Sequence, residues 1–212
     1  MCGRFSLWSD KNKIIDQFNL SSAPELQSNY NVIPSSSIPV IYSYEGNRVI
    51  ALRHWGLIPH WAKDKKYKQI NARSETLSEK PFFRDSFKNR RCLIPANGFY
   101  EWQGTKSNKQ PYYIKLKDNE LFAFAGLWDA WKGDDKTIES CTIITTAANE
   151  AMAPIHERMP VILDRDNYDQ WLNEGATELL APYSGEIDIY PVSTKVNKPS
   201  SNSAELMNPV VT

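Results

Sequence analysis

The sequence predicts an α+β domain in which short helices flank a curved, barrel-like and mostly antiparallel β-sheet. Segments rich in β-branched and aromatic residues follow one another between residues 91 and 145, separated by turn-forming residues at hairpin-like spacings. Segments with helical periodicity lie before and after this run instead of alternating with each strand, which is typical of an α+β arrangement. A chain of 212 residues suits one domain, so we expect residues 1–212 to form a single domain.

The first half of the chain predicts one helix, one hairpin and one long loop. Residues 9–20 place apolar side chains at helical intervals after a polar N-cap. Residues 38–44 and 48–55 predict two strands joined by a tight, glycine-containing turn. Residues 61–80 are polar and show little periodicity, apart from one expected helical turn near residues 71–77. Long irregular loops in compact domains are often functional, which directs attention to this one.

The second half of the chain predicts most of the sheet. The expected strands cover residues 91–94 continuing through 98–102, then 112–116, 121–131, 140–145, 158–163 and a last strand from residue 187. The turns that separate the central strands fall at residues 105–111, 117–120 and 132–136. Short helical segments are expected at residues 82–87, 147–152 and 166–173.

Composition excludes several classes of protein. Mean hydropathy is −0.52, and no stretch approaches the roughly 18–20 apolar residues that cross a membrane. No basic region followed by an apolar run opens the chain, so we expect a cytoplasmic protein, associated with the nucleoid in a bacterium. The three cysteines form no metal-binding spacing, and no glycine-rich phosphate loop, GxSxG or HExxH motif is present. We therefore expect no metal, no cofactor and no membrane partner.

The charges are balanced in total but unevenly distributed along the chain. The sequence carries 25 basic and 25 acidic residues, for a formal net charge of zero. Residues 61–91 contain ten basic and four acidic residues, whereas residues 163–190 contain seven acidic residues and one basic residue. A chain polarised in this way can present a basic face to nucleic acid despite its neutrality. A lysine-rich loop that is only solvated would have the same composition.

Cys2 is the first candidate for chemistry, because loss of Met1 would make it the amino terminus. The residue would then carry an amine with a pKa of about 7.7–8.0 and a thiol with a pKa of about 8.5 on adjacent carbons. An aldehyde can form a Schiff base with such an amine, and the thiol can then close a five-membered thiazolidine. An internal cysteine cannot do so, because its nitrogen is an amide. The alternative interpretation is a cysteine that is simply buried, which is common for this residue.

Three further residues, taken singly, are ambiguous. Glu101 ends an apolar strand pattern between two aromatic residues, where desolvation would raise its pKa and suit acid–base catalysis, although a salt-bridged edge residue fits equally. His156 lies in a proline-bounded turn, where a structural histidine is common. Asn71 heads a polar loop beside Arg73, whose guanidinium can bind a phosphate in a bidentate manner.

Eight ordered sequence blocks together resemble a known family. The chain is similar to the SRAP family (SOS response-associated peptidase-like proteins), whose members crosslink to abasic sites in single-stranded DNA. The blocks that carry the resemblance are MCGRF at 1–5, YNVIP at 30–34, WGLIPHWAK at 55–63, INARSET at 70–76, RCLIPANGFYEW at 91–102, TTAAN at 145–149, IHERMPVIL at 155–163 and YPVSTKVN at 190–197. They span about 200 residues in order and are far more specific than any single motif.

The resemblance implies a role for each candidate in the reaction. Cys2, after removal of Met1, matches the nucleophile that forms a thiazolidine with the aldehyde of the ring-opened deoxyribose. Asn71 matches the asparagine that hydrogen-bonds near the amine, and Glu101 matches the carboxyl that assists ring opening and proton transfer. His156 matches the histidine that moves protons during Schiff-base formation and reversal of the crosslink.

The resemblance also implies a set of DNA contacts. Arg4, Arg73 and Thr145 fall where members of the family hold the phosphates around the lesion. Pro34 and Trp102 fall where apolar residues line a sharply bent strand. The expected partner is therefore single-stranded DNA with abasic sites, bound by a monomer.

One departure concerns base stacking. Some members have a second tryptophan directly after the tryptophan of the WGLIPxW block, and this chain has Ala62 followed by Lys63 there. Stacking on an aromatic side chain contributes ~1–3 kcal/mol per base in other proteins. We therefore expect one neighbouring base to be held less tightly unless Trp61 or Tyr67 takes over this role.

Two other functions remain open from the sequence. A cysteine peptidase, as the older family name suggests, could use a Cys–His pair oriented by Glu101 and could remove Met1 by itself. A non-covalent single-strand DNA-binding module would not need Cys2 at all. Thiazolidine formation requires a free N-terminal amine, whereas a peptidase thiol works at any position in the chain, so the nucleophile's position discriminates between the chemistries.

Overall fold

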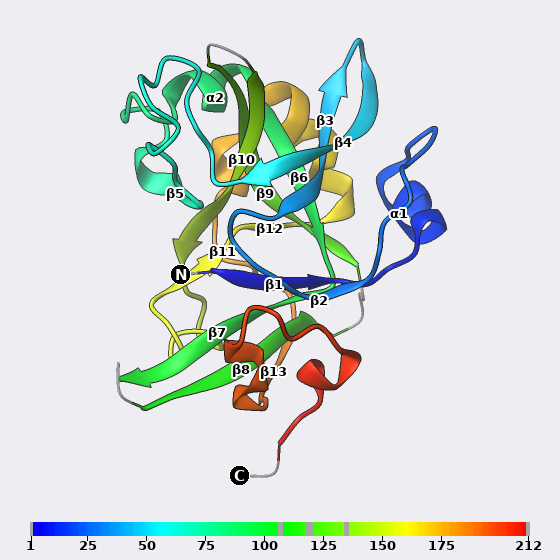
Figure 1. The fold of residues 1–212 in the computed structure, drawn as a ribbon, viewed down its shortest axis with the longest axis vertical. Helices are drawn as coiled ribbons and strands as arrows, with labels where there is room; N and C mark the ends of the chain where they lie inside the picture. Colours follow the sequence, from blue (N-terminus) through cyan, green and yellow to red (C-terminus); the bar gives the residue numbers. More distant parts are fainter. Residues whose placement is uncertain (1, 106–107, 118–120, 134–135, 211–212) are drawn as a thin grey trace.

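Five strands close into a barrel at the centre of the molecule (Figure 1). The computed structural model describes residues 2–210 except 106–107, 118–120 and 134–135. The strands pair in the order β10-β4-β3-β6-β9, and β9 pairs again with β10, which completes the ring. Their bounds are β3 Ser37–Tyr44, β4 Asn47–Trp55, β6 Arg91–Ala96, β9 Phe122–Lys132 and β10 Thr137–Ala147. The expected barrel-like α+β architecture is confirmed.

The ring closes through a parallel pair, which the hairpin spacings did not indicate. Strand β10 pairs antiparallel with β9 but runs parallel to β4, with Cys141 opposite Trp55. The short strand β5 (Asn71–Arg73) continues this parallel pairing, with Asn71 opposite Ile143. The chain between β4 and β5 is therefore a loop that leaves β10 and returns to it further along. Residues 74–76 follow as the 3₁₀ turn η1 (Ser74–Thr76), where the sequence predicted a helical turn.

A second sheet lies against one end of the barrel, with the order β13-β8-β7-β1-β2. All of its pairings are antiparallel. Its strands are β1 Arg4–Leu7, β2 Asn29–Val32, β7 Gly98–Thr105, β8 Asn108–Leu116 and β13 Ile187–Pro191. The short edge strands of the barrel sheet are β11 Arg158–Pro160 and β12 Ile162–Leu163. Residues 106–107, 118–120 and 134–135, in the three predicted turns, lie outside the described residues.

The predicted continuous strand from residue 91 to residue 102 divides at Asn97. The first part, β6, belongs to the barrel, and the second part, β7, belongs to the other sheet. The buried Asn97 side chain accepts hydrogen bonds from the backbone of Trp8 and Ser9, at 2.8 and 3.1 Å, and donates to the Ser9 hydroxyl. These bonds hold the corner where the chain passes from one sheet to the other.

The helices are short, as the sequence predicted. Helix α1 (Lys11–Phe18) is capped by the Asp10 carboxylate and buries Ile14 and Phe18, and α2 (Arg84–Asn89) follows the basic loop. The predicted helix at residues 166–173 is split into a 3₁₀ turn, η2 (Arg165–Asn167), and a π-helical turn, η3 (Gln170–Glu174). The helix predicted at residues 147–152 is absent from these residues, since Ala147 ends β10 and residues 150–152 form a turn. The remaining 3₁₀ turns are η4 Thr177–Leu179, η5 Thr194–Asn197 and η6 Ala204–Met207.

Aromatic side chains fill the space between the barrel and the second sheet. Phe5 of β1 contacts Trp55 and Phe124 edge-on, with ring centroids 5.2 and 5.8 Å apart. A smaller cluster on the other side of the second sheet is formed by Tyr100, Tyr113, Val192, Val196 and Leu206. Within the described part of the chain, no helix is long and apolar enough to cross a bilayer.

Candidate functional site

Cys2 lies just before β1, where the second sheet meets the barrel. Strand β1 pairs with β7 so that Arg4 is opposite Tyr100, and this antiparallel register leads the chain start toward Glu101 and Trp102. In Figure 1 the N-terminus lies beside β1 and β11, near the end of β10. The Cys2 side chain is fully buried. The residue is thus built into the framework and does not extend from it as a loose tail.

Asn71 holds the backbone of Cys2. Its side-chain Nδ2 donates a 3.0 Å hydrogen bond to the carbonyl oxygen of Cys2. Asn71 is fixed by the parallel pairing of β5 with β10, which is why a residue of the long loop reaches the chain start. Its Oδ1 is buried and accepts no hydrogen bond from the described residues. A buried acceptor without a donor is costly, so this oxygen is suited to receive an N–H of an incoming or newly formed group.

Glu101 lies on β7 and acts electrostatically on the Cys2 thiol. The carboxyl side chain is 4% exposed, in a strand otherwise flanked by aromatic residues. Burial raises the pKa of the Cys2 thiol far above its ordinary value, and the charge of Glu101 raises it further. The thiol is therefore protonated at neutral pH, and its Sγ donates to the Arg4 carbonyl at 3.8 Å.

His156 is held in a turn by its own backbone and by its ring. Its N–H donates to the carbonyl of Met152 at 3.0 Å, and its Nδ1 accepts a 3.0 Å bond from the backbone N–H of Arg158. An Nδ1 that accepts leaves the proton of the neutral ring on Nε2. His156 therefore presents Nε2–H as a hydrogen-bond donor, with its tautomer determined by the fold.

Arg158 contacts the candidate residue Thr145 and was not singled out from the sequence. Its guanidinium binds both carboxylate oxygens of Glu75 and also donates to the Thr145 carbonyl at 2.6 Å. Thr145 is fully buried, and its hydroxyl donates to the carbonyl of Ala72 at 3.4 Å. Arg158 thus ties the end of β10 to η1. Its position in the IHERMPVIL block, two residues after His156, could have indicated it. An arginine next to a glutamate is, however, too common a pattern to single out.

Arg4 and Trp102 are linked to the C-terminal part of the chain. Arg4 Nη1 donates to the Asn31 side chain at 2.8 Å and to the Val196 carbonyl at 2.7 Å, and the guanidinium lies 5.9 Å from the centre of the Trp102 ring. The indole N–H of Trp102 donates to Asn197 Oδ1 at 2.7 Å. These contacts place both residues beside the chain start, while their role toward DNA stays a prediction.

A basic, partly aromatic cavity opens next to Asn71. Its volume is about 260 Å³, and its lining residues are Gln69, Asn71, Arg73, Lys80, Phe82 and Phe83. Arg73 is exposed on this side, so the structure leaves its guanidinium accessible to a phosphate. Pro34 is half-buried in the turn before β3, and the Ser35 hydroxyl in this turn accepts a 3.0 Å bond from Lys68. The phosphate-contact roles of Arg73 and Thr145, and the strand-lining role of Pro34, stay predictions.

Two aromatic side chains on the basic loop are exposed. Trp61 and Tyr67 are 50% and 62% exposed, whereas Ala62 is buried and Trp55 belongs to the core. Trp61 also contacts Phe82, a wall of the basic cavity, with ring centroids 6.3 Å apart. Trp61 and Tyr67, the two side chains that we expected could replace the missing stacking tryptophan, are therefore accessible on the surface.

The acidic segment at residues 163–190 pairs with basic residues that lie outside the 61–91 segment. Asp169 pairs with Arg48 at 2.8 Å, Asp188 pairs with Lys115 at 3.4 Å, and Glu186 pairs with Lys117. These acids do not neutralise the basic loop. The described part of the chain contains no group of three or more His, Cys, Asp or Glu side chains positioned to bind a metal ion.

The arrangement defines a class of protein: a small barrel with a cysteine at its second position, a buried carboxylate and an asparagine around it, and a basic aromatic surface beside it. The comparisons with known proteins agree with this class. The profile described as SOS response associated peptidase (SRAP) matches residues 1–199, and the chain belongs to this family.

Relatives and solved structures cover nearly the whole chain. It is 48% identical over 221 residues to Abasic site processing protein YoqW of Bacillus subtilis, covering 98% of this chain and 99% of that protein. It is 36% identical to Abasic site processing protein HMCES of Xenopus tropicalis, covering 87% of this chain and 67% of the relative. A crystal structure of a Bacteroides thetaiotaomicron protein, 29% identical, covers 99% of this chain and 100% of its own with a TM-score of 0.89.

Proposed function

We propose that this protein processes abasic sites in single-stranded DNA by capturing them covalently through Cys2 once Met1 has been removed. The observation that carries the proposal is the setting of Cys2, whose carbonyl is held by Asn71 and whose thiol lies under the charge of the buried Glu101. In an N-terminal Cys2, the amine would then have Asn71 as a polar neighbour, and the thiol would have Glu101. The names of the relatives, which process abasic sites, support the same substrate.

The first step is attack of the Cys2 amine on the aldehyde carbon of the ring-opened deoxyribose. A carbon–nitrogen bond forms, the aldehyde oxygen leaves as water, and a Schiff base results. We assign Asn71 Oδ1, which accepts no hydrogen bond from the described residues, as the acceptor for an N–H of the amine while Nδ2 holds the Cys2 carbonyl. Such positioning supplies much of the rate of a reaction between two groups.

The second step is addition of the thiol to the imine carbon. A carbon–sulfur bond forms, the imine nitrogen gains a proton, and the thiol loses one, so the thiazolidine closes with no net change in charge. Because its pKa is raised, the thiol needs a base at that moment, and Glu101 is the carboxylate acting on it. His156, whose Nε2 carries the ring proton, is suited to donate a hydrogen bond to oxygen in ring opening or to nitrogen in reversal.

Binding of the strand requires no reading of bases. A basic surface holds phosphates without regard to sequence, and its affinity falls steeply with salt. A nucleotide without a base also costs less to unstack than an intact one, which favours entry of the lesion into the site. Arg73, Lys80 and the exposed aromatic residues Trp61 and Tyr67 supply a surface of this kind next to Asn71.

The experiment is to mix the purified protein with single-stranded DNA that carries one abasic site and to look for a denaturation-resistant adduct. The intact mass of the protein should lack Met1, and the adduct should form. Without borohydride, Cys2→Ala and a variant with one added N-terminal residue should both form none. Cys2→Ser should form only a Schiff base, which borohydride traps.

The control is Cys141→Ala, which removes another fully buried thiol and should leave adduct formation intact. Adduct formation by Cys2→Ala at the wild-type rate would overturn the covalent mechanism. Hydrolysis of peptides without any DNA adduct would favour the peptidase alternative.

A further inference from the structure

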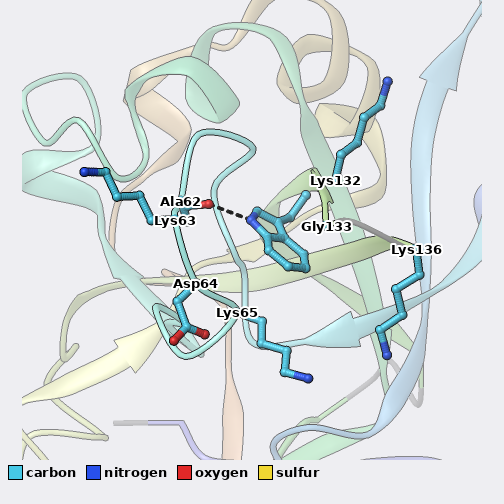
Figure 2. Close-up of a pocket in the computed structure, with 8 residues that line it drawn as sticks. Ala62, Lys63, Asp64, Lys65, Lys132, Gly133 and Lys136 are labelled. Atoms are coloured by element: carbon cyan, nitrogen blue, oxygen red, sulfur yellow. Dashed lines mark hydrogen bonds between the residues drawn. The ribbon is translucent and has the colours of Figure 1, made fainter.

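A second basic pocket, distinct from the cavity at Asn71, lies between the β4–β5 loop and the adjoining ends of β9 and β10 (Figure 2). Its volume is about 590 Å³. It is lined by Ala62, Lys63, Asp64, Lys65, Trp131, Lys132, Gly133 and Lys136. We refer to it as the lysine pocket. Four of the lining residues are lysines, whose positive charge attracts anions, and none of the lining residues takes part in the chemistry proposed above.

The lysine pocket has fixed walls. The indole N–H of Trp131 donates to the carbonyl of Ala62 at 2.7 Å, which fastens the β4–β5 loop to the hairpin (Figure 2). Two residues earlier, the backbone N–H of His60 donates to Asp129 at 3.0 Å. The lysines of the loop are therefore held next to those of the hairpin without any ligand. A preformed site loses less free energy on binding than one that must assemble.

Two of the four amino groups point to a common side. In Figure 2, Lys65 and Lys136 extend toward the same side of the pocket, while Lys63 and Lys132 point to other sides. Asp64, an acidic residue of the lining, has its Oδ2 at 3.9 Å from the Nζ of Lys66, a residue that does not line the pocket. Asp134 and Asp135 follow Gly133 in the sequence and lie outside the described residues, so the experiment below rests on the lysines. Lysine binds phosphate as a point charge, which suits a backbone contact that is independent of base sequence.

One loop connects the lysine pocket to the reaction site. The chain that forms Ala62 to Lys65 continues through the exposed Tyr67 to Gln69 and Asn71, which line the basic cavity. Strand β10 runs between the same two places, since Ile138 lies opposite Trp131 of the pocket and Ile143 lies opposite Asn71. Five steps along a strand span about 17 Å. In a stacked strand with about 3.4 Å per nucleotide, this equals about five nucleotides.

We propose that the lysine pocket binds backbone phosphates of the same DNA strand, about five nucleotides to one side of the abasic site. The inference rests on the proposed function, since it extends the DNA path away from Cys2. We assign this pocket to nucleic acid because one basic, aromatic loop, the β4–β5 loop, runs without interruption from the lysine pocket to the cavity at Asn71. The contact should therefore operate only on strands long enough to reach it, and only in one polarity.

The test measures non-covalent binding, so that it does not depend on Cys2 chemistry. The probes are labelled single strands that carry a tetrahydrofuran abasic analogue, which has no aldehyde. One probe has about five nucleotides and reaches only about 7 Å from the lesion on each side, whereas the other has about 25. Wild-type protein is compared with K65Q/K136Q and with K11Q/K13Q, a charge-matched control on α1, which Figure 1 shows on the other side of the molecule.

We expect K65Q/K136Q to bind the long probe less tightly, by about fivefold per lost contact at 0.1 M salt, and to lower the salt slope by about 1.4. Its affinity for the short probe should equal that of the wild type, and K11Q/K13Q should match the wild type on both. A probe extended on one side only should show the effect for one polarity and not for the other.

Equal affinities of K65Q/K136Q and wild type for the long probe would overturn the proposal. The pocket would then be a site for another anion, such as an acidic peptide. An equal loss on both probes would overturn it as well, because the contact would then lie at the lesion. The lysine effect on the long probe, found in a protein that forms no adduct with true abasic DNA, would refute the proposed function while supporting this inference.

Discussion

At the scale of single residues, the burial of Cys2 bears on the order of the reaction. The thiol is fully buried, and its pKa is raised by burial and by the charge of Glu101. Thiolate, and not thiol, is the strong nucleophile, so the sulfur is unreactive at neutral pH. The amine is then the group that attacks first, and the sulfur reacts only when an imine is present and Glu101 can remove its proton. Such an arrangement protects the cysteine from unrelated electrophiles.

The first prediction concerns Glu101→Gln, which removes the charge and the base but keeps the shape. Because the charge of Glu101 raises the thiol pKa, its loss should lower that pKa and increase the thiolate fraction at any pH. Alkylation of Cys2 by iodoacetamide at pH 8 should therefore be as fast as in the wild type, or faster. Adduct formation with abasic DNA should be slower by about 100-fold, the lower range for losing a general base.

The matched control for this prediction is Glu79→Gln, which removes an exposed carboxylate and should change neither rate. Slower alkylation together with slower adduct formation would contradict the assignment, since it would mean that Glu101 activates the thiol by promoting its ionisation. Mass spectrometry of the Cys2 peptide measures the first rate and a denaturing gel measures the second.

At this scale the sequence indicated which residues to look for but not how they are held. The resemblance named Cys2, Asn71 and Glu101, and the structure brings the first two into contact and places the third where its charge acts on the thiol. Arg158 was not predicted, because its partners, Glu75 and Thr145, become neighbours only through the pairing of β10 with β5 and β11. No spacing along the chain reveals such a contact.

At the scale of elements, the β4–β5 loop is held by the β9–β10 hairpin at three alternate residues. Ile58 donates from its backbone to the Ser140 hydroxyl at 2.9 Å, and His60 and Ala62 are bonded to Asp129 and Trp131. The alternation resembles a strand whose partners are side chains. It keeps the irregular loop in place and directs Trp61 outward.

Asp129 is the central anchor of this loop, and the second prediction concerns its removal. The buried carboxylate also accepts from Ser86 at 3.2 Å and pairs with Arg90 at 3.1 Å, which connects α2 to the same strand. Asp129→Ala leaves these donors without their acceptor and should reduce the free energy of unfolding by about 3 kcal/mol. For a chain of this length, that corresponds to a melting temperature lower by roughly 6–12 °C.

The control for Asp129 is Asp85→Ala, whose carboxylate is half exposed and lies 3.7 Å from His60 Nε2. It should cost less than about 1 kcal/mol, as exposed ion pairs do. Calorimetric scans of both variants measure the difference. Equal melting temperatures for Asp129→Ala and wild type would mean that the loop is not held by this carboxylate.

The third prediction concerns the pH dependence of the link between η1 and β11. Hydrogen bonds from Arg158 hold the pKa of Glu75 below its usual range. A carboxyl with a lowered folded-state pKa stabilises the protein above its unfolded pKa of about 4.3, and this contribution is lost as the pH falls through the folded value. Glu75→Gln should therefore reduce stability at pH 7, by less than about 1 kcal/mol because Glu75 is half exposed.

Urea unfolding at pH 7 and near pH 3 tests this linkage. The midpoints of Glu75→Gln and wild type should differ at the higher pH and converge at the lower one, where the Glu75 carboxyl of the wild type is becoming protonated. A difference that is the same at both values would show that the link does not depend on the charge of Glu75.

The elements themselves were largely predictable, whereas their partners were not. The α1 helix and the β3–β4 hairpin follow from local signals, a capping aspartate and a two-residue turn in which Glu45 and Gly46 both have positive φ. The division of residues 91–102 at Asn97 and the parallel pairing of β4 with β10 depend on contacts between distant segments. A local pattern indicates that a strand exists, but not which edge it pairs with.

At the scale of the whole molecule, the site depends on a segment far from it in sequence. After β13 the chain crosses the second sheet, and Asn31 and Arg4 bind the carbonyl of Val196 while Trp102 binds Asn197. The segment is then closed by a bridge between Val192 and Pro209. The side of the site formed by Arg4 and Trp102 is therefore supported by residues 192–209, of which the last ten lie beyond the family match.

Leu206 anchors this segment, and the last prediction concerns its truncation. The side chain is 2% exposed and packs with Val196, Tyr100 and Tyr113 in the smaller cluster. Leu206→Ala should reduce the free energy of unfolding by about 2–5 kcal/mol, as for other buried leucines, and lower the melting temperature by roughly 4–20 °C. Glu205→Ala, at the exposed neighbour, should change it little. If the two variants melted together at the wild-type temperature, the last residues would not be docked in solution, and Arg4 would be held by Asn31 and the preceding strand alone.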